Sequence, residues 1–76
     1  MAMKSYKNLS GKSGVVFFEP GGDYIDVQFT GGAIYRYSYR KPGVEKVEEM
    51  KKLAEIGLGL GSYISRHVKK DYEYKL

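Results

Sequence analysis

A pair of glycines, Gly31-Gly32, separates two segments of alternating polarity, residues 23–30 and 33–40, and this pattern limits the fold more than any other. Alternation with a period of two is typical of a β-strand that buries one face. Because glycine tolerates the positive φ angles of tight turns, a glycine pair between two such segments predicts an antiparallel hairpin. The buried face of the first segment would carry three apolar residues: Ile25, Val27 and Phe29.

The length of the hairpin loop decides which residues of the second segment face the core. A two-residue loop would place Arg36 among the apolar side chains, where an unpaired charge is costly. A three-residue loop at 31–33 instead places tyrosines opposite the apolar residues and leaves Arg36 on the solvated face. We therefore predict three cross-strand pairs: Phe29 with Tyr35, Val27 with Tyr37, and Ile25 with Tyr39.

One further strand and two helices are predicted around this hairpin. Residues 14–19 form an apolar run that ends at a turn signal at 20–22. Pro42 suits the first turn of a helix, and apolar residues recur after it at three- and four-residue spacing until Gly57. Ser62 is a typical N-cap residue and predicts that a second, short helix begins there. The apolar positions of the first helix are Val44, Val47, Met50, Leu53 and Ala54.

These elements predict a single α+β domain over residues 1–76. Its sheet would be a three-stranded antiparallel meander, and the two helices would pack on the one apolar face of that sheet. Residues 71–76 alternate in polarity and predict an extended C-terminal tail. The alternation leaves open whether this tail pairs with the sheet or docks on a partner.

The composition argues against catalysis and metal binding. The chain has no cysteine, and no Ser-His-acid arrangement accompanies its single histidine, His67. We predict that His67 is partly buried beside Ile64 and Val68. Asp23 and Asp26 stand three apart in a predicted strand, so their carboxylates would point to opposite faces. We therefore expect no enzymatic activity, no metal and no cofactor, and a small hydrolase or nuclease is the least favoured class.

The apolar segments are short. The run at 14–18 is too short to cross a bilayer, and the N-terminus lacks the pattern of a secretion signal. We therefore expect a cytoplasmic protein that does not insert into a membrane.

Three glycines, Gly57, Gly59 and Gly61, precede the second predicted helix and suggest a phosphate-binding loop. The nucleotide-binding fingerprint, however, needs a strand before its glycines, whereas a helix precedes these. No Lys-Ser or Lys-Thr pair follows Gly61 either. We interpret this segment as a helix stop followed by a flexible connector.

Basic residues gather in two places along the chain. Thirteen Lys and Arg against nine acidic residues give a net charge of +4, a mild excess that does not by itself indicate a partner. The clustering is more informative, because a local group of cations is the electrostatic footprint of a phosphate-binding surface. The first cluster consists of Arg36, Arg40 and Lys41, and the second of Arg66, Lys69 and Lys70.

Tyrosines alternate with basic residues between Tyr35 and Arg40. Two arrangements remain open for this row. Exposed rings would form a platform on which the bases of single-stranded RNA stack. Alternatively, the rings face the helices as core, with their hydroxyls at its rim. The predicted loop favours the core, because the exposed arrangement buries Arg36.

The chain resembles the KTSC domain. The resemblance rests on the segment 29–37, Pro42 with the helix after it, the segments 61–64 and 68–70, and a closing Tyr72-Glu73-Tyr74. It covers about residues 13–75, and its best marker is the Tyr-x-Tyr motif at Tyr35 and Tyr37. This family occurs at the C-terminus of some lysyl-tRNA synthetases and as small bacterial and phage proteins. The resemblance implies RNA binding and brings no catalytic residue or cofactor.

The sequence thus predicts a small, non-catalytic module that binds RNA or another single-stranded nucleic acid. The contacts would come from basic residues of the sheet and of the second helix: Arg36, Arg40, Lys41, Arg66, Lys69 and Lys70. The alternative is a protein-interaction or regulatory module that docks on a protein partner through a sheet edge or the tail at 71–76.

Overall fold

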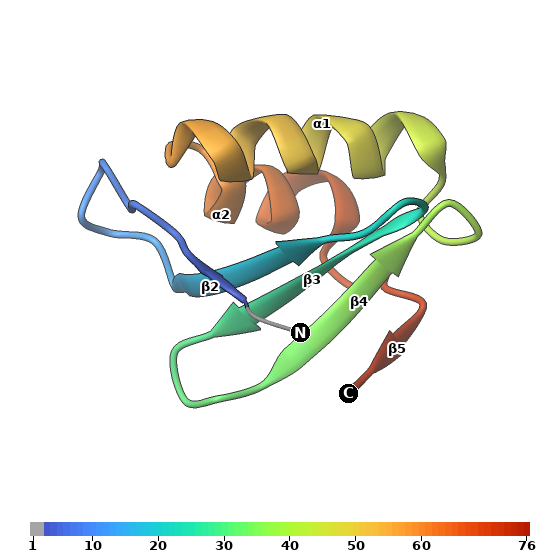
Figure 1. Ribbon diagram of the computed structural model, residues 1–76, viewed down its shortest axis with the longest axis horizontal. Coiled ribbons are helices and arrows are strands. Elements are labelled where there is room, and N and C mark those ends of the chain that lie inside the picture. Colours follow the sequence, from blue (N-terminus) through green and yellow to red (C-terminus); the bar gives the residue numbers. More distant parts are fainter. Residues whose placement is uncertain (1–2) are drawn as a thin grey trace.

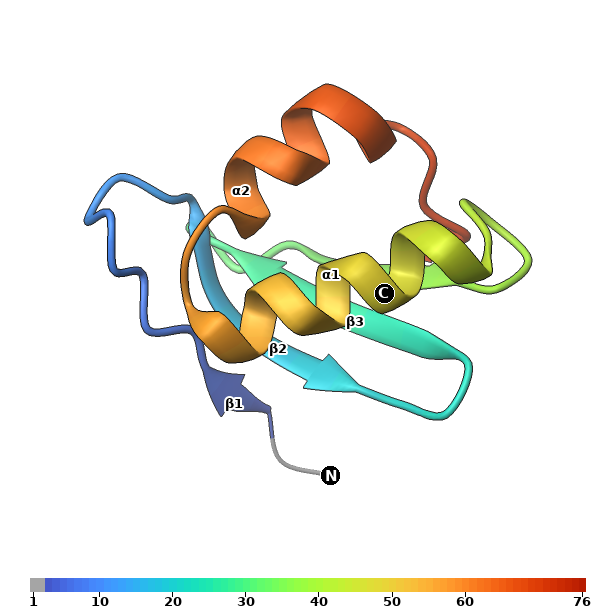
Figure 2. The ribbon, with the colours of Figure 1, turned by 90° about the horizontal axis from the view of Figure 1, so that it is seen from above.

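The computed structural model describes residues 3–76 and shows two layers, a twisted antiparallel sheet with helices over one face (Figure 1). The strands are β1 (Lys4–Ser5), β2 (Val15–Pro20), β3 (Tyr24–Phe29), β4 (Ile34–Ser38) and β5 (Tyr74–Lys75), in that order across the sheet. The helices are α1 (Val44–Ile56), α2 (Leu60–Tyr63) and the π-helical η1 (Ile64–Val68), which continues α2. Seen from above, α1 and α2 cross the same face of the sheet at an angle to each other (Figure 2).

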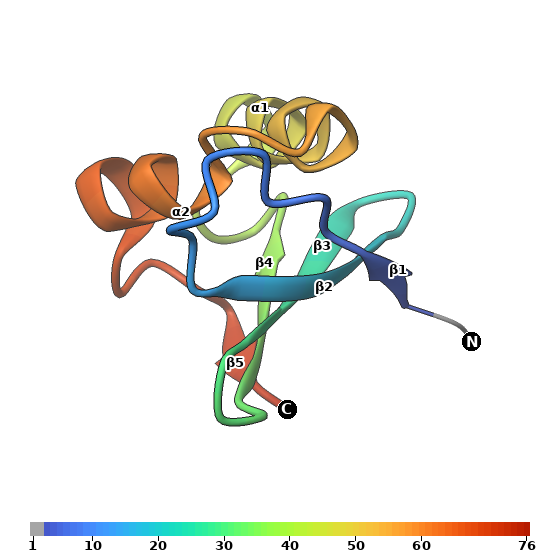
Figure 3. The same ribbon diagram turned by 90° about the vertical axis from the view of Figure 1, so that its left-hand side faces the viewer.

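The predicted α+β class is confirmed, but the prediction of three strands is wrong because the sheet has five. Residues of both chain ends add edge strands: β1 pairs with β2, and β5 pairs with β4. Figure 3 shows these two short strands at opposite edges of the sheet. Each has only two residues. The alternation at 71–76 left open whether the tail pairs with the sheet, and the structure shows that it does, with backbone bonds such as Glu73 N–H to the Arg36 carbonyl (2.7 Å).

The hairpin between β3 and β4 has a three-residue loop, as predicted, but the loop lies one residue earlier, at 30–32. The Phe29 amide donates to the Ala33 carbonyl (2.9 Å), and the observed pairs include Val27 with Tyr35 and Ile25 with Tyr37. The predicted pairs are therefore wrong by two positions. A shift of two keeps every side chain on its predicted face, because the side-chain period of a strand is two.

The ends of the helices differ in part from the prediction. Helix α1 begins at Val44, so Pro42 precedes it, and it ends as predicted at Gly57, whose φ of 85° suits glycine. The second helix begins at Leu60 rather than after Ser62. The Leu60 amide donates to the hydroxyl of Tyr6 (3.2 Å), so a distant tyrosine caps this helix in place of the expected serine.

The core lies between the sheet and the helices. Ile25, Val27 and Tyr37 of the sheet are buried against Val47 and Met50 of α1. Tyr37 is only 1% exposed, and the half-buried Tyr35 and Tyr39 pack against the same cluster. The core arrangement of the tyrosine row is thus confirmed. Burial, with smaller contributions from Tyr35 and Tyr72, raises the pKa of Tyr37 to about 12.

Between residues 3 and 76, no helix combines the length and the apolar character needed to cross a membrane.

Candidate nucleic-acid interface

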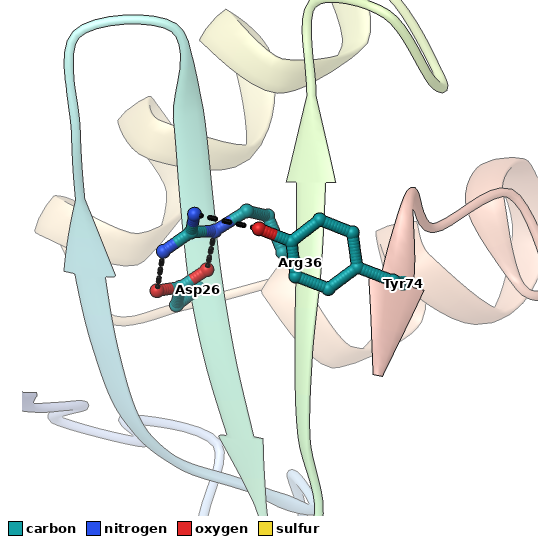
Figure 4. A network of polar contacts seen from close by, with 3 residues as sticks. All are labelled: Asp26, Arg36 and Tyr74. Carbon is teal, nitrogen blue, oxygen red and sulfur yellow. Dashed lines mark hydrogen bonds and ion pairs between the residues drawn. The ribbon is translucent and has the colours of Figure 1, made fainter. Parts of the chain in front are cut away.

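Arg36 lies on the predicted, helix-free face of the sheet, but its guanidinium is occupied. Its Nε and Nη2 donate to the two carboxylate oxygens of Asp26 at 2.7 and 2.9 Å, and its Nη1 donates to the Tyr74 hydroxyl at 2.9 Å (Figure 4). The Tyr24 ring lies beneath, with its centroid 3.9 Å from Arg36 Cζ. The hydrogen bonds that Arg36 donates to the Asp26 carboxylate raise the pKa of Arg36 well above its usual value. Arg36 therefore links β3, β4 and β5, and its charge is already paired with Asp26. We call these contacts of Arg36 with Asp26 and Tyr74 the clamp.

Arg40 and Lys41 follow the C-terminal end of β4, in the turn that leads to α1. The Arg40 side chain is 87% exposed, and its Nε lies 3.9 Å from the Glu73 carboxylate. Lys41 is exposed as well. The structure therefore does not join this pair to the cluster at 66–70, and neither residue lines the cavities described next.

A cavity of about 460 Å³ opens between the helix-covered face of the sheet, η1 and the segment that leads to β5. We call it the aromatic cavity. It is lined by Phe29, Ala33, Tyr35, Tyr37, Ile64, Lys69, Lys70 and Tyr72. The Tyr35 and Tyr72 ring centroids lie 4.6 Å apart, and the Phe29 ring meets Tyr35 edge-on at 5.8 Å. Aromatic faces and two lysines thus share one opening.

A second cavity, also about 460 Å³, adjoins the first. We call it the polar cavity, because serines, glycines and cations make up most of its wall. Its lining is Ser10, Lys12, Ser13, Gly14, Phe29, Gly59, Gly61, Ser62, Ile64, Ser65 and Arg66. Phe29 and Ile64 line both cavities, so the two share a wall. No carboxylate of the described residues lines either one.

The loop at 8–14 forms the outer wall of the polar cavity, and local polar contacts hold it there. Asn8 Oδ1 accepts the Ser13 amide at 3.1 Å, and Ser13 Oγ accepts the Val15 amide at 3.1 Å. A Cβ added at Gly61 would lie 2.7 Å from Ser13 Oγ. Gly61 therefore lets this loop approach the helix. The segment 57–61, interpreted from the sequence as a flexible connector, packs against the loop and forms part of the cavity wall.

Cations surround the two cavities: Lys12, Arg66, Lys69, Lys70 and Lys75. None of these five side chains forms an ion pair with another residue in the range 3–76. The second cluster predicted from sequence supplies three of them. Lys12 is distant from them in sequence, and the fold brings it to the polar cavity beside Arg66. Lys75 Nζ lies 5.8 Å from the centroid of the Tyr35 ring.

The prediction for His67 is wrong, because its side chain is exposed rather than partly buried. Its ring stacks on Tyr63, with centroids 4.6 Å apart, while Ile64 and Val68 face the core. The i→i+5 hydrogen bonding of a π-helix widens the turn and rotates His67 away from these neighbours. Across residues 3–76 there is no group of three His, Asp or Glu side chains that could hold a metal ion.

Comparisons of the chain with known protein families, with curated proteins and with solved structures found no match. The resemblance to the KTSC domain stays a prediction.

Proposed function

We propose that this chain is a small, non-catalytic module that binds single-stranded nucleic acid, RNA in particular, at the two adjoining cavities. The observation that carries the proposal is the aromatic cavity. No carboxylate from the part of the chain that the structure describes lines it, whereas aromatic rings and two lysines do: Phe29, Tyr35, Tyr72, Lys69 and Lys70. Stacking of one base on an aromatic side chain contributes about 1–3 kcal/mol and tolerates any base sequence. The lysines supply the cations that the phosphates of the same strand need.

The proposed contact set differs from the set predicted from sequence. It keeps Arg66, Lys69 and Lys70 and adds two further cations. Lys12 lines the polar cavity, and Lys75 Nζ lies 5.8 Å from the centroid of the Tyr35 ring, which lines the aromatic cavity. Arg36 is left out because its guanidinium already binds Asp26 and Tyr74. Arg40 and Lys41 are left out because they lie outside both cavities.

The test is a titration with single-stranded RNA of mixed sequence, followed by NMR of the labelled protein and repeated at several salt concentrations. The double variant Lys69→Ala/Lys70→Ala removes two cations from the aromatic cavity. Arg40→Ala/Lys41→Ala removes the same charge elsewhere and is the matched control. For single strands the slope of log K against log salt is about −0.7 per neutralised phosphate, so the first variant should flatten it by about 1.4. The control should leave the slope within about 0.3 of the unsubstituted value.

Equal losses in the two double variants would mean that RNA responds to net charge alone, which contradicts the proposed site. Absence of binding at near-physiological salt would contradict the function itself. The protein-docking alternative would then remain, in a narrower form. The tail at 74–75 is part of the sheet as β5, so the available docking element is the outer edge of β5 rather than a free tail.

A further inference from the structure

The polar cavity has a composition that the aromatic cavity lacks. Two cations, Lys12 from the loop and Arg66 from η1, reach it from different elements. Neither side chain pairs with a carboxylate elsewhere in residues 3–76. Four hydroxyls complete the wall: Ser10, Ser13, Ser62 and Ser65. A cavity lined by cations and hydroxyls, with no acid among its described residues, is complementary to an anion.

Several of these hydroxyls are free to donate. Ser13 Oγ already accepts the Val15 amide, so its own proton must point toward a different acceptor, and none of residues 3–76 supplies one. The side chains of Ser62 and Ser65 likewise make no hydrogen bond within the described chain and are exposed at the cavity. Hydroxyl donors beside two cations suit the oxygens of a phosphate group, which accept several hydrogen bonds at once.

The count of cations separates two kinds of phosphate. A phosphodiester inside a strand carries one negative charge, whereas a terminal phosphate monoester carries about −1.5 to −2 at pH 7. The two positive charges of Lys12 and Arg66 match the charge of a terminal phosphate monoester. Phe29 and Ile64 are common to both cavities, so a phosphate in the polar cavity would lie beside bases in the aromatic cavity. We infer that the polar cavity binds the terminal phosphate monoester of the strand whose bases lie in the aromatic cavity; this rests on the proposed function.

The experiment compares short single-stranded RNAs of one sequence that differ only at their ends. One has hydroxyls at both ends, one a 5′-phosphate, one a 3′-phosphate, and one a 5′-phosphate blocked as its methyl ester. Either the 5′-phosphorylated or the 3′-phosphorylated strand is expected to bind about tenfold more tightly than the hydroxyl-ended strand, because its terminal phosphate would gain two charge-assisted contacts. The methyl ester should lose most of that preference, since it keeps the phosphate but has only one charge.

Variants locate the effect. Lys12→Ala and Arg66→Ala should each remove most of the preference for a phosphorylated end. Because both residues belong to the proposed contact set, the affinity for the hydroxyl-ended strand should also fall, by about threefold for the loss of one cation; the readout is the ratio of the two affinities. Lys52→Ala removes an exposed cation of α1 that lines neither cavity, and it should keep the preference. Inorganic phosphate and a nucleoside monophosphate serve as probes without a strand, and both should bind more weakly than the phosphorylated RNA.

Each result decides between the two claims. Equal affinity for all four ends would overturn the phosphate inference while the strand-binding function stands. A preference that survives both Lys12→Ala and Arg66→Ala would overturn the assignment to this cavity. If no strand binds but inorganic phosphate shifts the Ser13 and Arg66 signals, the proposed function fails, and the strand end as the source of the phosphate fails with it.

Discussion

The helix-free face of the sheet and the edge of the aromatic cavity both combine a cation with tyrosines, and they differ in the groups that surround the cation. On the helix-free face, the Arg36 guanidinium contacts the rings of Tyr24 and Tyr74. It also forms a bidentate ion pair with Asp26, which is only 4% exposed. At the edge of the aromatic cavity, Lys69 and Lys70 lie beside Tyr35 and Tyr72, and no carboxylate of residues 3–76 lines the opening. The same residue types thus hold the sheet together in one place and leave charge available in the other.

The largest effect should come from breaking the clamp. Asp26→Ala leaves the Arg36 guanidinium, whose side chain is 22% exposed, without its carboxylate. Removing one partner of a largely buried ion pair is expected to lower the free energy of unfolding by about 3 kcal/mol. Urea denaturation measures this, with Arg40→Ala as a control that should cost under about 0.5 kcal/mol. A loss for Asp26→Ala no larger than the control would show that the clamp is only a surface contact.

Alkaline pH should lower the free energy of unfolding through Tyr37, which lines the aromatic cavity. Its pKa is raised to about 12, so above pH 10 the unfolded chain releases a proton that the folded protein retains. Stability from this group is complete below pH 10 and is lost as the pH rises toward 12. The slope is at most about 1.4 kcal/mol per pH unit for one proton.

The matched variant for this pH effect is Tyr37→Phe, which cannot ionise. Its free energy of unfolding should fall less steeply between pH 10 and 12 than that of the unsubstituted protein. Parallel curves for the two proteins would mean that Tyr37 titrates normally in the fold.

A smaller loss is expected from filling the contact between loop and helix. The Cβ of Gly61→Ala would meet Ser13 Oγ at 2.7 Å and displace the wall of the polar cavity. We expect a loss of about 1 kcal/mol in unfolding free energy, typical of a modest overpacking, together with loss of the end-phosphate preference. Gly22→Ala is the control, because a Cβ there meets no atom within 4 Å. An unchanged preference in Gly61→Ala would separate the loop from the site.

The smallest effect on stability should come from the free cations. Arg66→Ala removes an exposed side chain that has no ion pair among residues 3–76, so the unfolding free energy should change by less than about 0.5 kcal/mol. Thermal unfolding of this variant beside Asp26→Ala measures the contrast between the two regions directly. A large loss for Arg66→Ala would make it a structural residue like Arg36.

Much of the fold could be predicted from the sequence, because it depends on local periodicity. The alternation in 23–30 and 33–40 predicted the hairpin and the correct faces, and Gly57 predicted the end of α1. No signal in the sequence marks β1, which has two residues, and the alternation at 71–76 left open whether this segment pairs as β5. The register of the β3–β4 pair could not be predicted from the sequence either, because a shift of two residues leaves the polarity pattern unchanged.

The candidate site was predicted only in part, for a related reason. Arg66, Lys69 and Lys70 are close in sequence, so their clustering is visible without a structure. Lys12 and the serines of the loop reach the same place only because Tyr6 caps α2 and Gly61 admits Ser13. No local signal marks contacts between segments some fifty residues apart.

The sequence by itself determined the central hairpin, the buried face of its two strands, the helix that ends at Gly57 and the positions of the charges, since these follow from periodicity and residue chemistry. Only the tertiary structure decided which charges are free. Arg36 and Arg66 look alike in the sequence, yet the register sets Arg36 opposite Asp26, whereas Arg66 faces a cavity without a carboxylate among its described residues. A charge is paired or available according to the neighbour that folding brings within reach, because electrostatic attraction depends on distance and burial.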